Sequence, residues 1–211
     1  MSLTRLILVR HGNTFAAGDK VVWAGARTDL PLVEKGRTQA ATLATSLAAA
    51  AFKPDRFLAG PLIRTRQHAD IIAQHIGFTG EIEISGALRE IDYGTWEGRS
   101  TEEIHALGGE AELNAWNAEA AWPGSPGWSP SSDTILKSID KLLADLAEDS
   151  STGSAILVTS NGIMRFVAQC LTNPPEQLKV RTGHCCFLEH QEGRWVQTGW
   201  DQPPTAHKWE R

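Results

Sequence analysis

LILVRHGNT, residues 6–14, is the stretch that decides the expected fold class of this chain. A short apolar run followed by a polar turn is typical of a strand that is buried on both faces. Arg10 and His11 then stand at the carboxyl end of that strand, where open α/β sheets bind ligands. A neutral imidazole beside a guanidinium is suited to accept a phosphoryl group, and Gly12 lets backbone N–H groups approach an anion. An ordinary polar strand exit is the alternative interpretation.

The segments after this strand alternate between helix and strand patterns. Apolar periodicity predicts helices from residue 34 to the alanine-rich run before Pro54, from the GPLIRTRQHA segment to Gly77, and over residues 100–107, 133–147 and 161–171. Short apolar runs predict strands at residues 55–59, 82–84 and 154–159, and the last runs, 185–190 and 195–200, are typical of an antiparallel hairpin. This order predicts an α/β protein.

Length and composition indicate a single domain over residues 1–211, since 41% hydrophobic residues are enough for a sizeable core. The formal net charge of −5 argues against a nucleic-acid partner, so an anionic ligand needs a local basic pocket. Cys170, Cys185 and Cys186 lack framework spacing, which predicts reduced thiols and a cytoplasmic location. No apolar run reaches the ~20 residues of a membrane span, and none has the pattern of a signal peptide, so no membrane partner is expected.

Residues 99–132 are predicted to form an insertion in this domain. A short helix over residues 100–107 has Glu103 as a capping partner for Ser100. Residues 108–132 show the least regular pattern and hold Trp116, Trp122 and Trp128 among Pro, Gly and Ser. Long loops in compact domains are often lids, so we expect the insertion to lie over a ligand site. A satellite hydrophobic cluster under a loop is the alternative.

Two predicted buried strands each lead into a polar turn. LILV is followed by RHG, and AILVT is followed by SNG at residues 160–162. Since neighbouring parallel strands end at the same edge of a sheet, these two turns are expected side by side. Arg64 stands at the start of a helix, and a guanidinium at a helix N-terminus is suited to phosphate. Glu90 adds a carboxyl group that is a candidate proton donor.

The segments LILVRHGNT, TDLPLVEKGRTQA, GPLIRTRQHA and LREIDYGTWEG follow one another in the chain, and AILVTSNG stands fifth. In this order and spacing they resemble the motifs of the histidine phosphatase superfamily, in its phosphoglycerate-mutase-like branch 1. The resemblance extends from residue 6 to about residue 200. It implies a three-layer α/β/α sandwich with a mostly parallel central sheet, and phosphoryl transfer through a phosphohistidine. It implies no metal or other cofactor, since two arginines supply the positive charge.

Carried over residue by residue, the resemblance implies that His11 is the nucleophile and that Arg10 and Arg64 hold the phosphate oxygens. Glu90 would give a proton to the leaving oxygen and then take one from the water that hydrolyses the phosphoenzyme. Three further residues are predicted to complete the phosphate site: Asn13, Asn161 and Gly162.

The residue types suit these roles independently of the resemblance. Histidine is nucleophilic and mostly neutral at cytosolic pH, and the planar fork of arginine matches two phosphate oxygens. Burial near an anionic phosphate raises the pKa of a carboxylic acid. Asp92 and Glu97 stay open as alternatives to Glu90, and Arg66 as the alternative to Arg64. A solvated loop carboxylate is the other interpretation of Glu90.

The chain departs from the family's pattern at the second catalytic histidine, because Asn161 occupies that position. An amide donates without charge, and charge-assisted hydrogen bonds are about twice as strong as neutral ones. Losing a donor that acts in the transition state costs on the order of 10²–10³ in rate. His184, just before a predicted strand, is the candidate for a compensating histidine, and an ordinary strand-edge residue is the alternative. A second departure is SSD at residues 131–133, where the family often has Gly, Glu and Ser.

The sequence therefore predicts a phosphomonoester hydrolase that acts through a phosphohistidine on a small soluble phosphorylated metabolite, with turnover slowed at Asn161. A phospho-ligand-binding protein without turnover is the alternative. A phosphoglycerate-type mutase is less favoured, because the family's mutases have a longer insertion after the glutamate segment. A homodimer and a monomer are both open.

Overall fold

The structure is a computed structural model, and it describes residues 5–149 and 151–205. Within these ranges the strands are β1 (Arg5–Arg10), β2 (Arg56–Ala59), β3 (Ile82–Ile84), β4 (Ser154–Thr159), β5 (Cys185–Gln191) and β6 (Arg194–Gln202). The helices are α1 (Glu34–Ala49), α2 (Ile63–Ile76), α3 (Thr101–Ala106), α4 (Glu110–Glu119), α5 (Ser132–Glu148) and α6 (Asn161–Gln169), with short 3-10 turns η1 (Gly86–Leu88) and η2 (Gly94–Trp96). The strands and helices predicted from periodicity are present at their predicted places, with small shifts at the ends.

The strands of the described chain form one sheet in the order β3-β2-β4-β1-β5-β6. β1, β2, β3 and β4 pair in parallel, whereas β5 and β6 run antiparallel as the predicted hairpin. β1 and β4 are direct neighbours, with Arg10 in register with Thr159. The turns that follow these two strands therefore lie at the same edge of the sheet.

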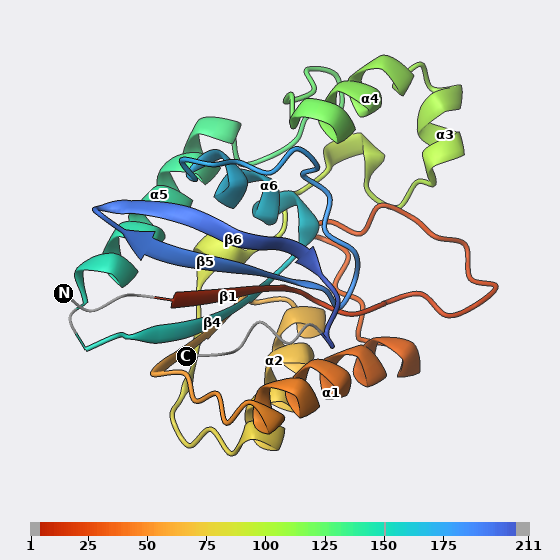
Figure 1. Cartoon of the computed structure of the whole chain (residues 1–211). Helices are drawn as coiled ribbons and strands as arrows, with labels where there is room; N and C mark the ends of the chain where they lie inside the picture. Colours follow the sequence, from red (N-terminus) through yellow and green to blue (C-terminus); the bar gives the residue numbers. More distant parts are fainter. Residues whose placement is uncertain (1–4, 150, 206–211) are drawn as a thin grey trace.

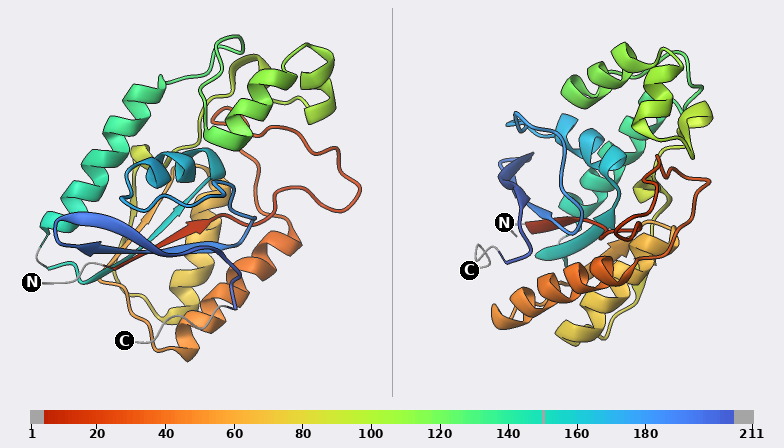
Figure 2. Two further views of the ribbon diagram at one scale, coloured as in Figure 1. Left: turned by 45° about the horizontal axis from the view of Figure 1, so that its top comes forward. Right: turned by 90° about the vertical axis from the view of Figure 1, so that its right-hand side faces the viewer.

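Helices cover both faces of this sheet, as Figures 1 and 2 show. In β1, Leu6 and Leu8 belong to one apolar cluster, and Ile7 and Val9 belong to another. Successive side chains of a strand point to opposite faces, so both faces of β1 are buried. α1 and α2 pack on the face of Ile7, while α5 and α6 pack on the face of Leu6. The predicted three-layer α/β/α sandwich with a mostly parallel sheet is confirmed.

The insertion is more regular than the sequence pattern indicated. α3 begins with the predicted capping box, in which Ser100 and Glu103 exchange hydrogen bonds. Residues 110–119, expected to be irregular, form helix α4. Ala, Glu and Leu have high helix propensity, and this outweighs the surrounding Gly and Pro that suggested a loop. None of the helices in the described ranges combines the length and the apolar character needed to cross a bilayer.

The tryptophans of the insertion form one aromatic cluster with residues from elsewhere in the chain. Trp128 lies at its centre, with the ring of Tyr93 at 4.8 Å and that of Trp116 at 4.9 Å between centroids. Trp128 and Trp116 are both buried within the apolar core on the α5 face. Edge-to-face aromatic pairs each add about 0.5–1.5 kcal/mol beyond area burial. The insertion is thus anchored to the core by this cluster while Trp116 also lines the cavity described next.

Candidate active site

A cavity of about 550 Å³ lies at the carboxyl ends of β1 and β4. The β1 turn contributes Arg10 and His11, and α2 contributes Arg64. Glu90 comes from the segment between η1 and η2, and Asn161 from the first turn of α6. The parallel pairing of β1 with β4 brings these groups from distant parts of the sequence to one place.

His11 presents one defined nitrogen to this cavity. Its side chain is buried, and its backbone N–H donates to the carbonyl of Thr159 at 3.0 Å. Nδ1 lies 2.8 Å from the carbonyl oxygen of Gly12. A carbonyl only accepts, so Nδ1 carries the hydrogen and, in the neutral ring, Nε2 keeps the lone pair. Burial first, and then the charges of Arg64 and Arg10, hold the pKa of His11 well below its ordinary value. The ring is therefore neutral at physiological pH, with the lone pair of Nε2 available.

Arg10 and Arg64 supply positive charge beside this imidazole. Arg64 is 1% exposed, and its guanidinium donates three hydrogen bonds, at 2.8–3.2 Å, to backbone carbonyls of residues 24–28. Arg10 donates to the carbonyl of Val180. A guanidinium has five N–H donors, so both arginines keep donors for a ligand. Arg66, the sequence alternative to Arg64, is exposed and does not line the cavity.

Glu90 is a buried carboxyl group in the lining of the same cavity. Its oxygens accept the N–H groups of Ile91 at 3.0 Å and of Gly162 at 3.3 Å, and it is hydrogen bonded to Tyr93. Burial raises the pKa of Glu90 above its ordinary value, although Arg64 opposes the shift. A Cβ on Gly162 would lie 2.3 Å from Glu90 Oε1, so only glycine allows this approach.

The acidic alternatives to Glu90 lie elsewhere. Asp92 and Glu97 form ion pairs with Arg27, at 3.0 and 3.4 Å, and neither lines the cavity. Glu90 is the one carboxylate among the described residues that line it.

Asn161 and Asn13 both line the cavity, and the side-chain amide oxygen of each already accepts a hydrogen bond. Asn161 Oδ1 accepts the N–H of Val180 at 3.0 Å, and Asn13 Oδ1 accepts the hydroxyl of Thr182 at 2.7 Å. With the oxygen of each amide engaged in this way, its NH₂ group is the end left to donate to an anion. His184 is placed differently, because its Nδ1 lies 3.0–3.1 Å from the backbone and carboxylate oxygens of Asp201, and it is not among the lining residues.

Arg165 is a site residue that sequence reasoning missed. It is 1% exposed, donates to the carbonyls of Trp116 and Asn117 at 2.7 and 3.2 Å, and lies over the Trp116 ring at 4.9 Å. It lines the cavity one helical turn after Asn161. The signal that could have found it is a single cation between the apolar residues of GIM and FVA in helix α6. The described lining is strongly cationic, because it combines one carboxylate, that of Glu90, with five basic residues: Arg10, Lys35, Arg64, Arg165 and Lys179.

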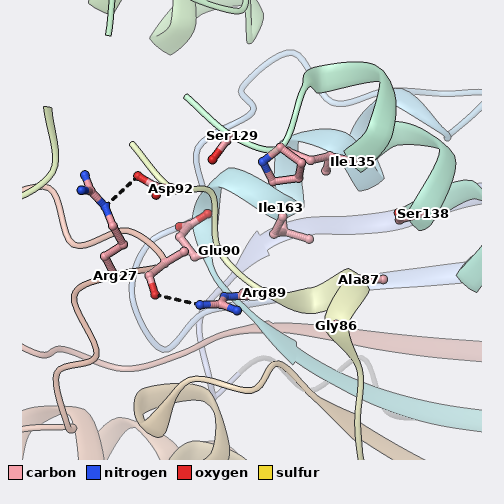
Figure 3. Close-up of a pocket in the computed structure, with 12 residues that line it drawn as sticks. Arg27, Gly86, Ala87, Arg89, Glu90, Asp92, Ser129, Ile135, Ser138 and Ile163 are labelled. Carbon is pink, nitrogen blue, oxygen red and sulfur yellow. Dashed lines mark hydrogen bonds and ion pairs between the residues drawn. The ribbon is translucent and has the colours of Figure 1, made fainter. Parts of the chain in front are cut away.

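A second cavity, of about 350 Å³, is lined in part by Glu90 (Figure 3). It is lined by Arg27, Arg89 and Asp92 on one side and by apolar residues such as Ile135 and Ile163 on the other. Figure 3 shows Arg27 paired with Asp92. Glu90 thus lines both cavities. No group of three or more His, Cys, Asp or Glu residues arranged for a metal ion occurs within the described residues.

The fold and the cavity can be compared with known proteins. Residues 6–203 match the histidine phosphatase superfamily (branch 1), and the chain belongs to that superfamily. It is 30% identical over 194 residues to the adenosylcobalamin/alpha-ribazole phosphatase of Salmonella typhimurium, covering 90% of this chain and 92% of that protein. It is 28% identical over 185 residues to the 2,3-bisphosphoglycerate-dependent phosphoglycerate mutase of Methylobacterium radiotolerans, covering 84% and 85%. The resemblance seen in the motifs is confirmed.

Solved structures support the same fold. A mycobacterial glucosyl-3-phosphoglycerate phosphatase in complex with VO3 superposes with a TM-score of 0.78 at 24% identity, covering 94% of this chain and 98% of that one. The superfamily relatives of this chain thus include both phosphatases and mutases.

Proposed function

We propose that this protein is a phosphomonoester hydrolase that acts through a phosphohistidine at His11 on a small phosphorylated metabolite. The observation that carries this proposal is the neutral His11 ring, with its lone pair on Nε2, in a cavity that also holds Arg10, Arg64 and a buried Glu90. The names of the phosphatases among the relatives support the reaction class.

The residues support a reaction in two steps. In the first step Nε2 of His11 attacks phosphorus, the bond from phosphorus to the ester oxygen breaks, and Glu90 gives its proton to that oxygen. In the second step Glu90 takes a proton from water, the water oxygen attacks phosphorus, and the phosphorus–nitrogen bond breaks to release phosphate. Arg10 and Arg64 stabilise the negative charge on the phosphoryl oxygens in both steps. Asn161 donates a neutral hydrogen bond, so this donor contributes less than a cation would.

The experiment is to incubate the protein with a panel of phosphate monoesters and measure the release of inorganic phosphate. Phosphohistidine is acid-labile, so the phosphoenzyme is trapped under alkaline conditions and compared with His11→Ala. We expect both phosphate release and a trapped phosphoenzyme with the wild-type protein, and neither with His11→Ala. Absence of both turnover and phosphoenzyme across the panel would reject the proposal in favour of a phospho-ligand-binding protein.

Hydrolase and mutase activity are separated by one substrate. With 3-phosphoglycerate, a hydrolase releases phosphate, whereas a mutase moves it to another hydroxyl group. We expect release, which the phosphatases among the relatives support. Chain length does not separate the two activities, because 84% of this chain aligns with 85% of the phosphoglycerate mutase relative. A cytoplasmic location and a monomer or homodimer are further parts of the proposal, tested by fractionation and by light scattering.

A further inference from the structure

Gly12, in the turn after β1, lies in close contact with the backbone of helix α1. A Cβ on Gly12 would lie 2.4 Å from the carbonyl oxygen of Gly36, and a Cβ on Gly36 would lie 2.2 Å from the carbonyl oxygen of Asn13. The two backbones are therefore in direct contact. Glycine has more accessible backbone conformations than any other residue, so the conformation of Gly12 depends on what its neighbours fix.

Two side chains, one from each helix on this face of the sheet, hold the peptide groups on either side of Gly12. His68 of α2 accepts the Gly12 N–H through Nδ1 at 3.0 Å. Gln39 of α1 accepts the Asn13 N–H through Oε1 at 2.9 Å. The first N–H belongs to the peptide group between His11 and Gly12. The second belongs to the peptide group whose carbonyl is that of Gly12.

That second carbonyl is the acceptor for His11. The Gly12 oxygen lies 2.8 Å from His11 Nδ1 and so keeps the hydrogen on that nitrogen. A neutral imidazole without such a partner distributes its hydrogen between two nitrogens, and only the tautomer with a free Nε2 suits attack from that atom. The direction of the Gly12 carbonyl therefore determines which nitrogen is nucleophilic.

We infer that His68 and Gln39 are positioning residues that fix the two peptide groups flanking Gly12 and thereby set the tautomer of His11. The inference rests on the proposed function for its effect on rate, but the tautomer itself can be measured without any substrate.

His68 is suited to accept and not to donate at this position. It is 0% exposed, and burial lowers its pKa to about 3, so it is neutral throughout the physiological range. Its Nδ1 faces an N–H and therefore holds a lone pair, which leaves the hydrogen on Nε2. Nε2 has no hydrogen-bond partner within the described residues. Among those residues, the hydrogen bond from the Gly12 N–H is therefore the one that the His68 ring forms.

The test is ¹⁵N NMR of the histidine rings together with steady-state kinetics. In the wild-type protein we expect His11 with hydrogen on Nδ1 and none on Nε2. His68→Ala and Gln39→Leu should each shift His11 toward the other tautomer. Each should also lower kcat about 10-fold to 10²-fold with little change in KM, because a small misplacement of a reacting group has effects of this size.

His68→Asn is the conservative variant, since its Oδ1 atom can occupy the place of Nδ1 and accept the same N–H. We expect it to restore both the tautomer and most of kcat. His75→Asn is the matched control, because His75 is exposed on the same helix and should leave both measurements unchanged.

Retention of the Nδ1–H tautomer in Gln39→Leu and in a folded His68→Ala would overturn the inference, whatever the activity. So would the opposite tautomer in the wild type. If His68→Ala does not fold, Gln39→Leu and His68→Asn decide the question by the same NMR signal. If neither the wild type nor any variant hydrolyses a phosphate ester, the proposed function is rejected. The NMR signal of His11 still shows whether the two side chains set its tautomer.

Discussion

The turns after β1 and β4 lie side by side at one edge of the sheet, but they bring different charge to the cavity. Strand β1 ends at Arg10 and the turn begins with His11, so a cation and a neutral imidazole follow one another. The β4 turn supplies Asn161, whose Oδ1 already accepts a backbone N–H. The cation on the β4 side is Arg165, one turn further along α6, and its guanidinium donates to two carbonyls of α4.

This difference indicates a division of roles. Under the proposed function, the β1 turn holds the groups that act on phosphorus directly, and side chains of α1 and α2 accept its N–H groups. The β4 turn supplies the neutral donor Asn161. The nearby cation, Arg165, donates hydrogen bonds to α4 and so helps to hold the insertion in place. We therefore expect changes at the β1 turn to affect the rate most, and changes at the β4 turn to affect the rate less and stability more.

His11→Ala should have the largest effect, lowering phosphate release by about 10⁴-fold or more, because it removes the one imidazole among the described residues that line the cavity. The measurement is initial rate on a phosphate monoester, with alkaline trapping of the phosphoenzyme. His75→Ala serves as the control. A His11→Ala protein that keeps a tenth of the activity would remove the β1 turn from the chemistry.

Glu90→Gln should lower kcat about 10²-fold to 10³-fold, since it removes the proton donor. Burial raises the pKa of Glu90 above its ordinary value, and the acid form is lost as pH rises through that raised pKa. Burial and two arginines hold the pKa of His11 well below 6.5, so its neutral form is lost only at lower pH. The wild-type profile should therefore fall on the alkaline side of the Glu90 pKa, and Glu90→Gln should lack that fall. An unchanged alkaline limb in the variant would assign the proton to another group.

Arg165→Met should lower the free energy of unfolding by about 2 kcal/mol, because it leaves two buried carbonyls without a charged donor. Urea unfolding followed by tryptophan fluorescence measures this, since Trp116 lies under the guanidinium. Arg66→Met, on an exposed side chain, is the matched control. Equal stability of the two variants would mean that the β4 side does not anchor the insertion.

Asn161→Ala should have the smallest effect, lowering kcat about 5-fold to 10-fold, as expected for one neutral hydrogen bond. Asn161→His should raise kcat while leaving phosphate binding intact, because it adds a charge-assisted donor beside the phosphoryl group. Both are measured as kcat and KM on the same ester. A rate for Asn161→His at or below the wild-type rate would indicate that another group already supplies that charge.

Much of the fold followed from local patterns. The short continuous apolar runs in LILV and SAILVT predicted strands with two covered faces, and both strands lie at the centre of the sheet. Residues 110–119 escaped prediction, because the Gly and Pro residues around them are typical of a loop, whereas the contacts of Trp116 that hold helix α4 come from distant parts of the chain. The site was predicted in part for a related reason. Arg10, His11, Arg64, Glu90 and Asn161 stand in recognisable motifs and all line the cavity, whereas Arg165 stands in none.

The sequence by itself determined the elements, their α/β order and the residue types suited to phosphoryl transfer, because these depend on periodicity and side-chain chemistry. Only the tertiary structure decided which of these groups meet. It separated Arg64 from Arg66 and Glu90 from Asp92 by burial, and it tied His184 to Asp201. It also decided which nitrogen of His11 is free, because that depends on a carbonyl direction fixed by contacts with two helices far along the chain.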